Sequence, residues 1–528
     1  MLTEPISRLI ERWRSFVPAD PQPHEPAVVT IHVDEIAAKI AKFYERIRNV
    51  VDYREEHLFR KNCILRGLQR RALMGGDQRN VGLELIKEII RSGHLPNDTI
   101  PETRAEEVDR ILQTLATLLD RSASLFPQEA EQLRGWLIRL SACAVEECLA
   151  PPIKDRVVSE LMYTTIEKHL MIKGEDVSAS DRKTQLFIAV QKTLLKVDED
   201  QLAYRLLKFL YPYWDNPSPT ELESIARQLP SIYHSTHLFL KDPLNVPFYK
   251  LCNHYNTVFL LIGDAIFANP ETRGAPIKLV EDPNRLHAAV TEAYGKRFKQ
   301  QKRSLQRLAF FSIISLFITK VLIALAVEIP IDRWMNDFSV TNTIVNIAFP
   351  PLLLLVIILL IRMPSSKNIA RVIAEVDAVL YEDQKKDYLL VLLKDRPGLI
   401  KSIVRLFYFA LSVSILGLVS NLLYQWGFSI ASIVVFILFT SIVAATGVKV
   451  HNRSREISLE EHRPTFVGFI ADLVFIPFVS LGTITIAGLE HVKFLVLIVN
   501  LIDVPFLEFV TFIEHFNTFL RYKKDELH

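Results

Sequence analysis

A series of long apolar segments between residues 308 and 516 constrains this chain more than any other feature of its sequence. Several of these segments reach the ~20 residues that an α-helix needs to cross the hydrocarbon core of a bilayer. The part of the chain before residue 308 contains no comparable segment. We therefore predict an integral membrane protein with a large water-soluble region at its N-terminal side.

The apolar segments predict a six-span α-helical transmembrane bundle within residues 307–516. A cytoplasmic amphipathic connection covers residues 363–402, and a cytoplasmic tail covers residues 517–528. The apolar face of the connection is expected to dock on the soluble region rather than lie on the membrane. The predicted spans are residues 308–329, 341–362, 403–424, 427–448, 465–488 and 491–513.

Lysine and arginine residues are concentrated on one side of the predicted membrane. The segment GKRFKQQKRSLQR before the first span carries six of them, whereas the opposite side has only Arg333 and Lys493. Because cytoplasmic loops carry an excess of positive charge, both termini are predicted to be cytoplasmic. The expected location is a multi-pass cell or inner membrane. Aromatic residues at the outer edges of the spans fit an interfacial belt: Trp334, Tyr424 and Trp426.

Helical periodicity dominates residues 1–306, so the whole chain is predicted to be all-α. The first long pattern begins at Asp34, a candidate N-cap, and later patterns are separated by clusters of Pro, Gly and Asp. The segment at residues 93–102 is a candidate boundary within this cytosolic region. A bundle or an α-solenoid-like arrangement is expected. The later patterns cover residues 81–92, 106–119, 129–149, 154–170, 183–195, 199–210 and 286–307.

The segment at residues 257–268 is strongly apolar but too short to cross a bilayer. Apolar helices of ~10–14 residues are more often buried in a soluble core. We therefore predict a core helix at this position rather than a seventh span.

Composition and motifs exclude several classes of function. The net charge is only +2, so nucleic acid is not an expected partner. The four cysteines all precede residue 253 and form no paired framework, which suits a reducing cytosol. Phosphate-binding loops, zinc-protease helices and nucleophile elbows are all absent from the sequence.

One group of side chains has the chemistry of a metal site but not the spacing. His234, His237, Cys252 and His254 could offer four ligands, but they match no common zinc module. We therefore predict neither a metal nor another cofactor, and no enzymatic activity.

Polar residues inside the predicted spans are the candidate functional residues. An ionisable side chain in a bilayer costs ~2.5–3.5 kcal/mol at a helix centre, so each should face protein or water. Counted at ~1.5 Å per residue, Lys320, Asp472 and Asp503 lie ~12–18 Å from the cytoplasmic edge. We therefore expect Lys320 to pair with Asp503, Asp472 or both. The predicted intramembrane cluster comprises Lys320, Asp472, Asn500, Asp503 and Glu508.

Two functions remain open on the sequence. In the favoured interpretation the cytosolic helical region binds a protein partner, the spans anchor it or relay a signal, and the charged cluster locks the helices together. In the alternative, the cluster lines the path of an ion, a proton or a small solute through a channel or transporter. The lipid bilayer is a partner in both, and a homo-oligomer is compatible with either.

Overall fold

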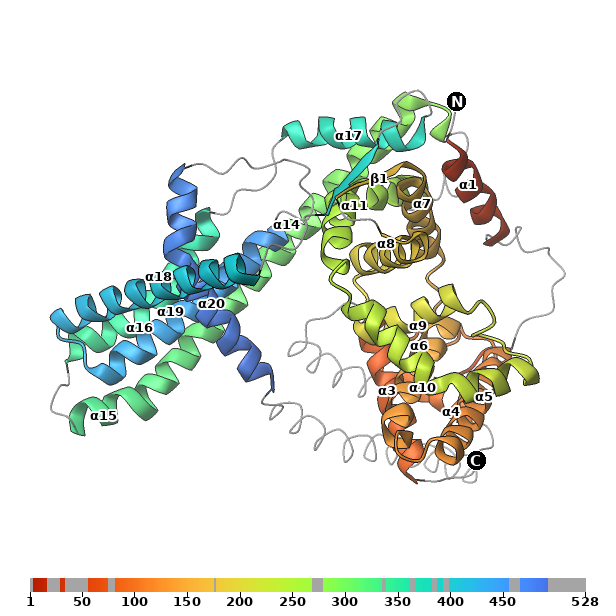
Figure 1. Cartoon of the computed structure of the whole chain (residues 1–528), viewed down its shortest axis with the longest axis horizontal. Coiled ribbons are helices and arrows are strands. Elements are labelled where there is room, and N and C mark those ends of the chain that lie inside the picture. The colour runs from red at the N-terminus through yellow and green to blue at the C-terminus, as the bar shows by residue number, and fades with distance from the viewer. Residues whose placement is uncertain are drawn as a thin grey trace, which may run out of the picture. The chain divides into compact units, whose positions relative to one another are not determined.

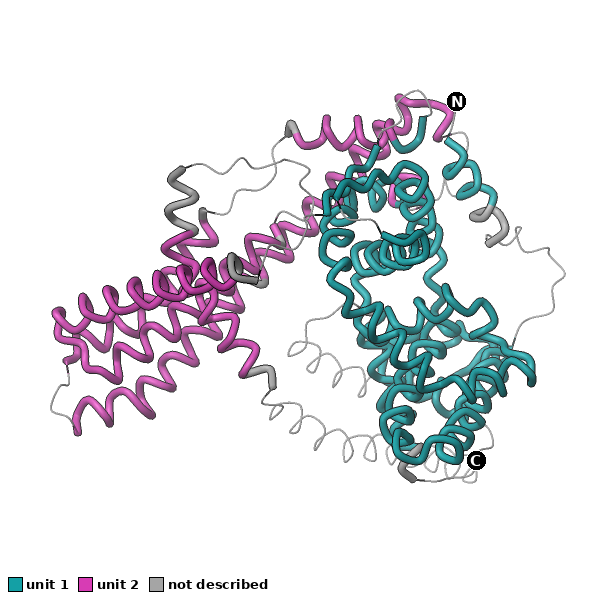
Figure 2. The backbone as a smooth tube through the Cα atoms, in the orientation of Figure 1, with its two compact units in different colours: residues 1–263, 379–392, 498–528 teal, residues 264–378, 393–497 magenta. Residues whose placement is uncertain are grey.

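The computed structural model is almost entirely helical (Figure 1). It divides into two compact units (Figure 2). The helical unit comprises residues 1–263, 379–392 and 498–528, and the apolar unit comprises residues 264–378 and 393–497. The structure describes residues 3–16, 29–33, 56–74, 81–174, 177–267, 279–334, 339–360, 366–381, 387–392, 398–454 and 466–491.

The helical unit contains the helices that the periodicity predicts, with ends shifted by a few residues. The pattern that begins at Asp34 lies largely outside the described residues. The helices are α1 (Glu4–Phe16), α3 (Glu56–Met74), α4 (Val81–Arg91), α5 (Thr103–Leu125), α6 (Ala130–Leu149), α7 (Ile153–His169), α8 (Ala179–Leu194), α9 (Glu199–Leu210), α10 (Pro219–Lys241) and most of α11 (Asn245–Phe267).

Side-chain caps define where three of these helices begin. Ser178, Asp198 and Ser218 each accept a hydrogen bond from a backbone N–H in the first turn of α8, α9 and α10. These bonds satisfy donors that have no partner within the helix. At α10 the side chain of Glu221 also bonds back to the Ser218 backbone, which completes a capping box.

One apolar core joins helices on both sides of the segment at residues 93–102. Trp136, Leu133 and Leu85 are almost completely buried in it. Leu95 and Ile100, from the segment itself, belong to the same core. Burial of this kind contributes about 1.5–3 kcal/mol for each large apolar side chain. Helices α4 and α5, on either side of this segment, therefore share one apolar core.

A short parallel sheet brings a distant part of the chain into the helical unit. Strand β1 (Leu170–Lys173) pairs with β2 (Tyr388–Val391), and Leu170 lies opposite Tyr388. The next residue after β1, Gly174, has a φ of 118°. A Cβ atom there would lie 1.9 Å from the carbonyl oxygen of Leu392, so only glycine fits. The predicted connection at residues 363–402 thus supplies one strand to the helical unit.

The apolar unit is built from long helices. Helix α14 runs without a break across the predicted boundary at residue 306 and continues into a π-helix. The elements are α14 (Pro283–Ile323), the π-helix (Ala324–Glu328), α15 (Ile329–Trp334), α16 (Val340–Leu360), α17 (Ser366–Leu380, whose last two residues belong to the helical unit), α18 (Gly398–Gln425), α19 (Ile430–Ser454) and α20 (Phe466–His491).

Four helices in the described part of the chain are long and apolar enough to cross a membrane, and each overlaps one of the first four predicted spans. Their bounds are Pro283–Trp334, Val340–Leu359, Ser402–Gln425 and Ile430–Asn452. The fifth predicted span falls on α20, where a shorter apolar stretch covers Leu473–Gly488. The sixth lies outside the described residues.

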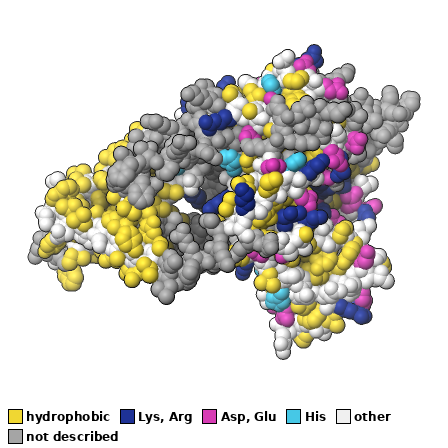
Figure 3. Space-filling view, turned by 45° about the horizontal axis from the view of Figure 1, so that its top comes forward, with side chains coloured by type: hydrophobic (Ala, Val, Ile, Leu, Met, Phe, Trp, Pro, Cys, Tyr) yellow, Lys and Arg dark blue, Asp and Glu magenta, His cyan; other side chains and the backbone are white. Residues whose placement is uncertain are grey.

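From Phe310 onward much of the surface of these helices is apolar, and Figure 3 shows hydrophobic side chains gathered on the part of the molecule that they form. Phe310 is 60% exposed, Leu322 is 61% exposed and Leu359 is 73% exposed. Soluble monomers rarely leave such large contiguous apolar surfaces in water. This exposure and the four long helices together indicate a membrane protein. By contrast, Val258, Phe259, Leu261 and Ile262 in the second half of α11 are fully buried. This burial is what the predicted core helix at residues 257–268 requires, of which residues 257–267 are described.

The amphipathic helix α17 is docked on protein. Val372 and Val376 on its apolar face are fully buried. Its polar residues hold the first part of α14: Asp377 bonds to the His287 ring at 2.9 Å, and Asn368 donates to the Tyr294 hydroxyl at 3.0 Å. Helix α17 therefore packs against the part of α14 that precedes the first predicted span.

Small residues let the long helices approach each other closely. A Cβ atom on Gly482 of α20 would lie 2.0 Å from the Ser441 carbonyl oxygen of α19. A Cβ atom on Gly447 of α19 would lie 2.9 Å from the side chain of Ile357 in α16. Close packing around glycine is a common means of association between helices in lipid, where the hydrophobic effect contributes little.

Candidate functional site

A buried ion pair lies in the interior of the apolar unit. The Nζ atom of Lys320 in α14 donates a hydrogen bond to Oε1 of Glu328 at the end of the π-helix. The two side chains are 0% and 1% exposed. Removing such a pair from water costs several kcal/mol per ion, so good geometry and further hydrogen bonds are needed to stabilise it.

The π-helix brings these two residues onto one face of the helix. In an uninterrupted α-helix with 3.6 residues per turn, positions eight apart are separated by ~80° around the axis. The π-helix between Ala324 and Glu328 has wider turns, with hydrogen bonds from residue i to i+5. Each of its residues therefore advances by a smaller angle, which returns Glu328 to the face that carries Lys320.

Neighbouring helices complete the coordination of the pair. Asn346 of α16 donates from Nδ2 to Oε2 of Glu328 at 2.7 Å and lies 3.3 Å from the Ser432 carbonyl oxygen. The Lys320 ammonium also lies 4.9 Å from the ring centre of Phe439 in α19, a cation–π contact. Residues from three helices thus converge on one ion pair.

A second polar group joins α15 to the start of α19. The carboxylate of Asp332 is buried and accepts hydrogen bonds from the hydroxyls of Ser429 and Ser432. Ser429 in turn accepts a hydrogen bond from the Ser432 backbone N–H and so caps α19. A carboxylate next to a helix N-terminus is also stabilised by the helix dipole.

Three buried polar atoms in the interior of the apolar unit have no hydrogen-bond partner among the described residues. They are Oδ1 of Asn346, Oγ1 of Thr440 and Oγ of Ser441. A buried polar group without a partner costs about 1–3 kcal/mol, so such groups in a native structure point to bound water, an ion or another ligand. Asn346 bonds to Glu328 of the ion pair, and Thr440 and Ser441 directly follow Phe439 in the sequence of α19.

The predicted cluster is described only in part. Lys320 lies in the buried interior, and its partner there is Glu328. Asp472 belongs to α20, but its side chain lies outside what the structure describes, as do Asn500, Asp503 and Glu508. The pairing of Lys320 with Asp472 or Asp503 is therefore not seen, and the roles of these four residues stay predictions.

Sequence reasoning missed Glu328, Asp332 and Asn346. Glu328 lies near the end of the first apolar segment, where a charge is readily accommodated at the membrane surface. The available signal was the pair of acidic residues in AVEIPIDRW, together with a polar asparagine six residues into the second span.

The helical unit contains a second candidate site, a cleft with a volume of about 500 Å³. This value lies within the range of about 300–1,000 Å³ typical of ligand pockets. One side of the cleft is apolar and the other is charged. The apolar side includes Leu115, Leu118, Leu137, Leu140, Leu222 and Ile225.

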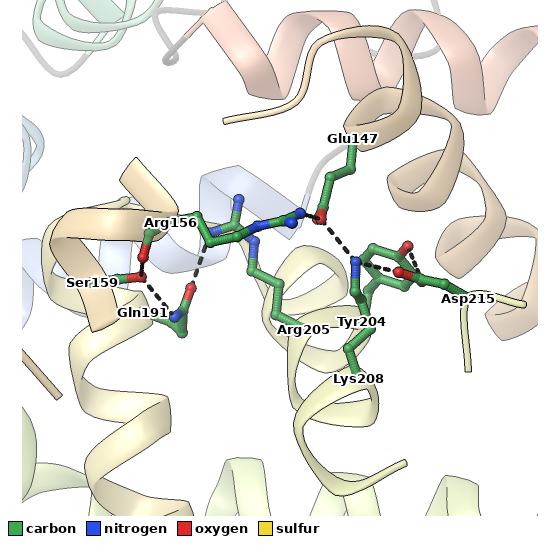
Figure 4. Close-up of polar contacts among 8 residues, drawn as sticks. All are labelled: Glu147, Arg156, Ser159, Gln191, Tyr204, Arg205, Lys208 and Asp215. Carbon is green, nitrogen blue, oxygen red and sulfur yellow. Dashed lines mark hydrogen bonds and ion pairs between the residues drawn. The ribbon is translucent and has the colours of Figure 1, made fainter. Parts of the chain in front are cut away.

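The charged side is held in place by its own ion pairs (Figure 4). Glu147 of α6 accepts hydrogen bonds from Arg156 of α7 and, at 2.8 Å, from Lys208 of α9. Lys208 also lies 2.5 Å from Asp215, which accepts a hydrogen bond from the Tyr204 hydroxyl at 2.6 Å. The chain of contacts orients these side chains before any ligand arrives.

Burial and charge shift the acidities around this cleft. Burial alone would raise the pKa of Glu147, but Lys208, Arg156 and Arg205 outweigh it and hold the pKa below the ordinary value of 4.5. Burial raises the pKa of Cys148 to about 11, and the carboxylate of Glu107 adds to this shift. At neutral pH Glu147 is therefore ionised and Cys148 is a thiol, which is a poor nucleophile.

The histidines and cysteine of the possible metal group have other surroundings. His237 bonds to the Tyr233 carbonyl oxygen at 2.9 Å, His234 lies 3.6 Å from Glu129, and Cys252 is fully buried. Within the described ranges, no cluster of three or more His, Cys, Asp or Glu residues could hold a metal ion.

Comparison of the chain with protein-family models, curated proteins and solved structures gave no match. The functional argument therefore rests on the geometry of the two candidate sites.

Proposed function

We propose that this chain is a multi-pass membrane protein with cytoplasmic termini, whose helical unit lies in the cytosol and binds a protein partner. The cleft of the helical unit carries this proposal. Its charged side is ordered by internal ion pairs, while its apolar side offers leucine side chains to an incoming group. Interface hot spots have this character, with an apolar anchor in a preformed pocket beside oriented polar groups.

The cleft also suggests the chemistry of the partner. Arg110 lines it, is exposed, and has no ion-pair partner among the described residues. The carboxylates of Glu147 and Asp215 are already paired with Lys208. A segment that inserts an apolar side chain against Leu118 and places an acidic group beside Arg110 would fit both features.

The test fills the cleft without disturbing its ion pairs. Ser141 lines the cleft, so Ser141→Trp should block it. Ser124→Trp is the matched control because Ser124 is exposed on α5 and is not part of the cleft lining. Full-length protein is solubilised from native membranes, and its bound proteins are identified by mass spectrometry.

A partner bound by this cleft should co-purify with the wild type and with Ser124→Trp but not with Ser141→Trp. Titration of the purified partner onto each variant should then show at least tenfold weaker binding for Ser141→Trp. The proposal fails if the two tryptophan variants bind the same proteins with equal affinity.

A second function, transport of an ion or proton, is favoured by the interior of the apolar unit. The Lys320–Glu328 pair lies there, and Asn346, Thr440 and Ser441 each leave a buried oxygen without a described partner. Ionisable residues at membrane depth often mark proton or ion paths. Reconstitution in liposomes with an imposed pH or ion gradient tests it: transport predicts a flux that Lys320→Met abolishes, and absence of flux in the wild type contradicts it.

A further inference from the structure

The first membrane helix carries a group of cations whose charges are not neutralised by the protein. Within α14, Lys296 and Arg297 are paired with Glu292 and Asp264. Four further cations between residues 299 and 307 are exposed and have no carboxylate partner among the described residues. These four form what we call the basic face: Lys299, Lys302, Arg303 and Arg307.

The basic face continues directly into apolar surface on the same side of α14. At ~100° per residue the four cations fall within an arc of about 140° around the helix. Phe310, Ile314 and Phe317, which are 60%, 39% and 48% exposed, project within the same arc. Because α14 is one continuous helix from Pro283 to Ile323, this alignment is fixed by the backbone.

The position of the basic face along the helix matches the headgroup layer. At ~1.5 Å per residue, Arg307 and Lys299 are ~12 Å apart along the axis. The polar layer on each side of a bilayer is ~5–8 Å thick, and long cationic side chains extend further along the helix. If Phe310 marks the start of the hydrocarbon, the cations nearest to it reach the lipid phosphates.

We propose that the basic face of α14 binds the headgroups of anionic phospholipids in the cytoplasmic leaflet. Clusters of Lys and Arg beside a membrane helix attract anionic lipids, and each added cation strengthens the attraction. The basic face is continuous with exposed aromatic and aliphatic side chains, which favours a lipid over a soluble acidic protein. Acyl chains can cover Phe310 and Phe317 while the lipid phosphates contact the cations. The proposal rests on the membrane insertion argued above.

The experiment compares lipid binding by four forms of the full-length protein. Delipidated protein in detergent is titrated with phosphatidylglycerol, phosphatidylserine or phosphatidylcholine of identical acyl chains, and bound lipids are counted by native mass spectrometry. The forms are wild type; the basic-face variant with Lys299→Gln, Lys302→Gln, Arg303→Gln and Arg307→Gln; a charge-retaining variant with Lys299→Arg, Lys302→Arg, Arg303→Lys and Arg307→Lys; and a control variant with Arg121→Gln, Lys173→Gln, Lys241→Gln and Lys250→Gln.

The control variant removes the same number of exposed cations from the helical unit. Wild type, control and charge-retaining forms should all prefer both anionic lipids to phosphatidylcholine by about tenfold or more, and the basic-face variant should lose this preference. The preference should also weaken at high salt, because exposed charges are screened. Inorganic phosphate, added at the same concentration as the lipid, tests for a site that takes free phosphate: full competition would contradict a lipid site.

Two checks separate this inference from its premises. Thermal unfolding shows whether the basic-face variant is folded. If it is not, a variant with only Lys302→Gln and Arg303→Gln replaces it, and this variant should lose part of the preference for anionic lipids. Equal preference for anionic lipids in the basic-face and wild-type forms overturns the inference. Membrane insertion is then still supported if both forms bind phosphatidylcholine. Failure of the wild type to bind any lipid or to fractionate with membranes overturns the insertion instead.

Discussion

The ammonium of Lys320 and the carboxylate of Glu328 form an ion pair inside the apolar unit, two helical turns apart and with almost no exposure of either side chain. The π-helix between them makes this contact geometrically accessible. Asn346 and Phe439 supply further contacts from α16 and α19. The pair therefore links three helices that are otherwise joined by apolar packing.

Loss of one partner of this pair should destabilise the protein more than loss of both. Lys320→Met leaves the Glu328 carboxylate buried without its cation, a change that costs ~3–5 kcal/mol in soluble proteins. Lys320→Met combined with Glu328→Gln removes both charges and should recover most of the loss. Thermal unfolding in detergent measures the two variants. Lys250→Met is the control, since Lys250 is exposed and should tolerate the change. No recovery in the double variant would contradict the pairing.

The close approach of α19 and α20 should depend on Gly482. Because a Cβ atom there would meet the Ser441 carbonyl oxygen at 2.0 Å, Gly482→Ala must push the helices apart. Overpacking of this kind costs about 1–3 kcal/mol. Gly417 in α18 has open space around it, so Gly417→Ala should be neutral or slightly stabilising. The midpoints of thermal unfolding of both variants are measured in detergent. Equal midpoints for Gly482→Ala and Gly417→Ala would show that α19 and α20 do not pack closely at Gly482.

Periodicity and length allowed much of the fold to be predicted. Helical spacing located most helices of the helical unit, and apolar length located four helices able to cross a membrane. The short strands β1 and β2 escaped prediction because each has only four residues and pairs across more than 200 positions of sequence.

The candidate sites were predictable only in part. Lys320 stands out because it is a single charge in an apolar segment. Its pairing with Glu328 was not predictable, since regular α-helical spacing places residues eight apart on different faces and only the π-helix aligns them. The cleft of the helical unit combines Arg110, Ser141 and Lys208 from three helices, and no spacing in the sequence reveals that association.

Acid should weaken the ion pairs beside the cleft. The pKa of Glu147 in the folded protein lies below its ordinary value of 4.5, because Lys208, Arg156 and Arg205 outweigh the effect of burial. A carboxyl with a lowered folded pKa stabilises the fold above its unfolded pKa, and this contribution is lost as pH falls through the folded pKa. Glu147→Gln should therefore cost about 1–3 kcal/mol at pH 7, through the loss of hydrogen bonds to charged groups, and progressively less below pH ~4.5.

Denaturation of both forms at several pH values, followed by circular dichroism, measures this dependence. Glu131→Gln, at an exposed position of the same helix, should leave the pH profile of the wild type unchanged. A stability difference between wild type and Glu147→Gln that stays constant from pH 7 to pH 3 would show that Glu147 is not the titrating group.

The proposed topology predicts which end of the apolar unit faces outward. Nδ2 of Asn342 at the start of α16 donates to the Gly427 carbonyl oxygen at 2.7 Å, so this helix end and the turn between α18 and α19 lie together. Cysteines introduced by Thr341→Cys and Trp426→Cys, in a form with Cys148→Ser, should both react with a membrane-impermeant maleimide added outside intact cells. Gln300→Cys, exposed on α14 before the span, should react only after permeabilisation. Labelling of Gln300→Cys from outside with protection of the other two would invert the topology, and labelling of only one of the pair Thr341→Cys and Trp426→Cys would contradict their shared location.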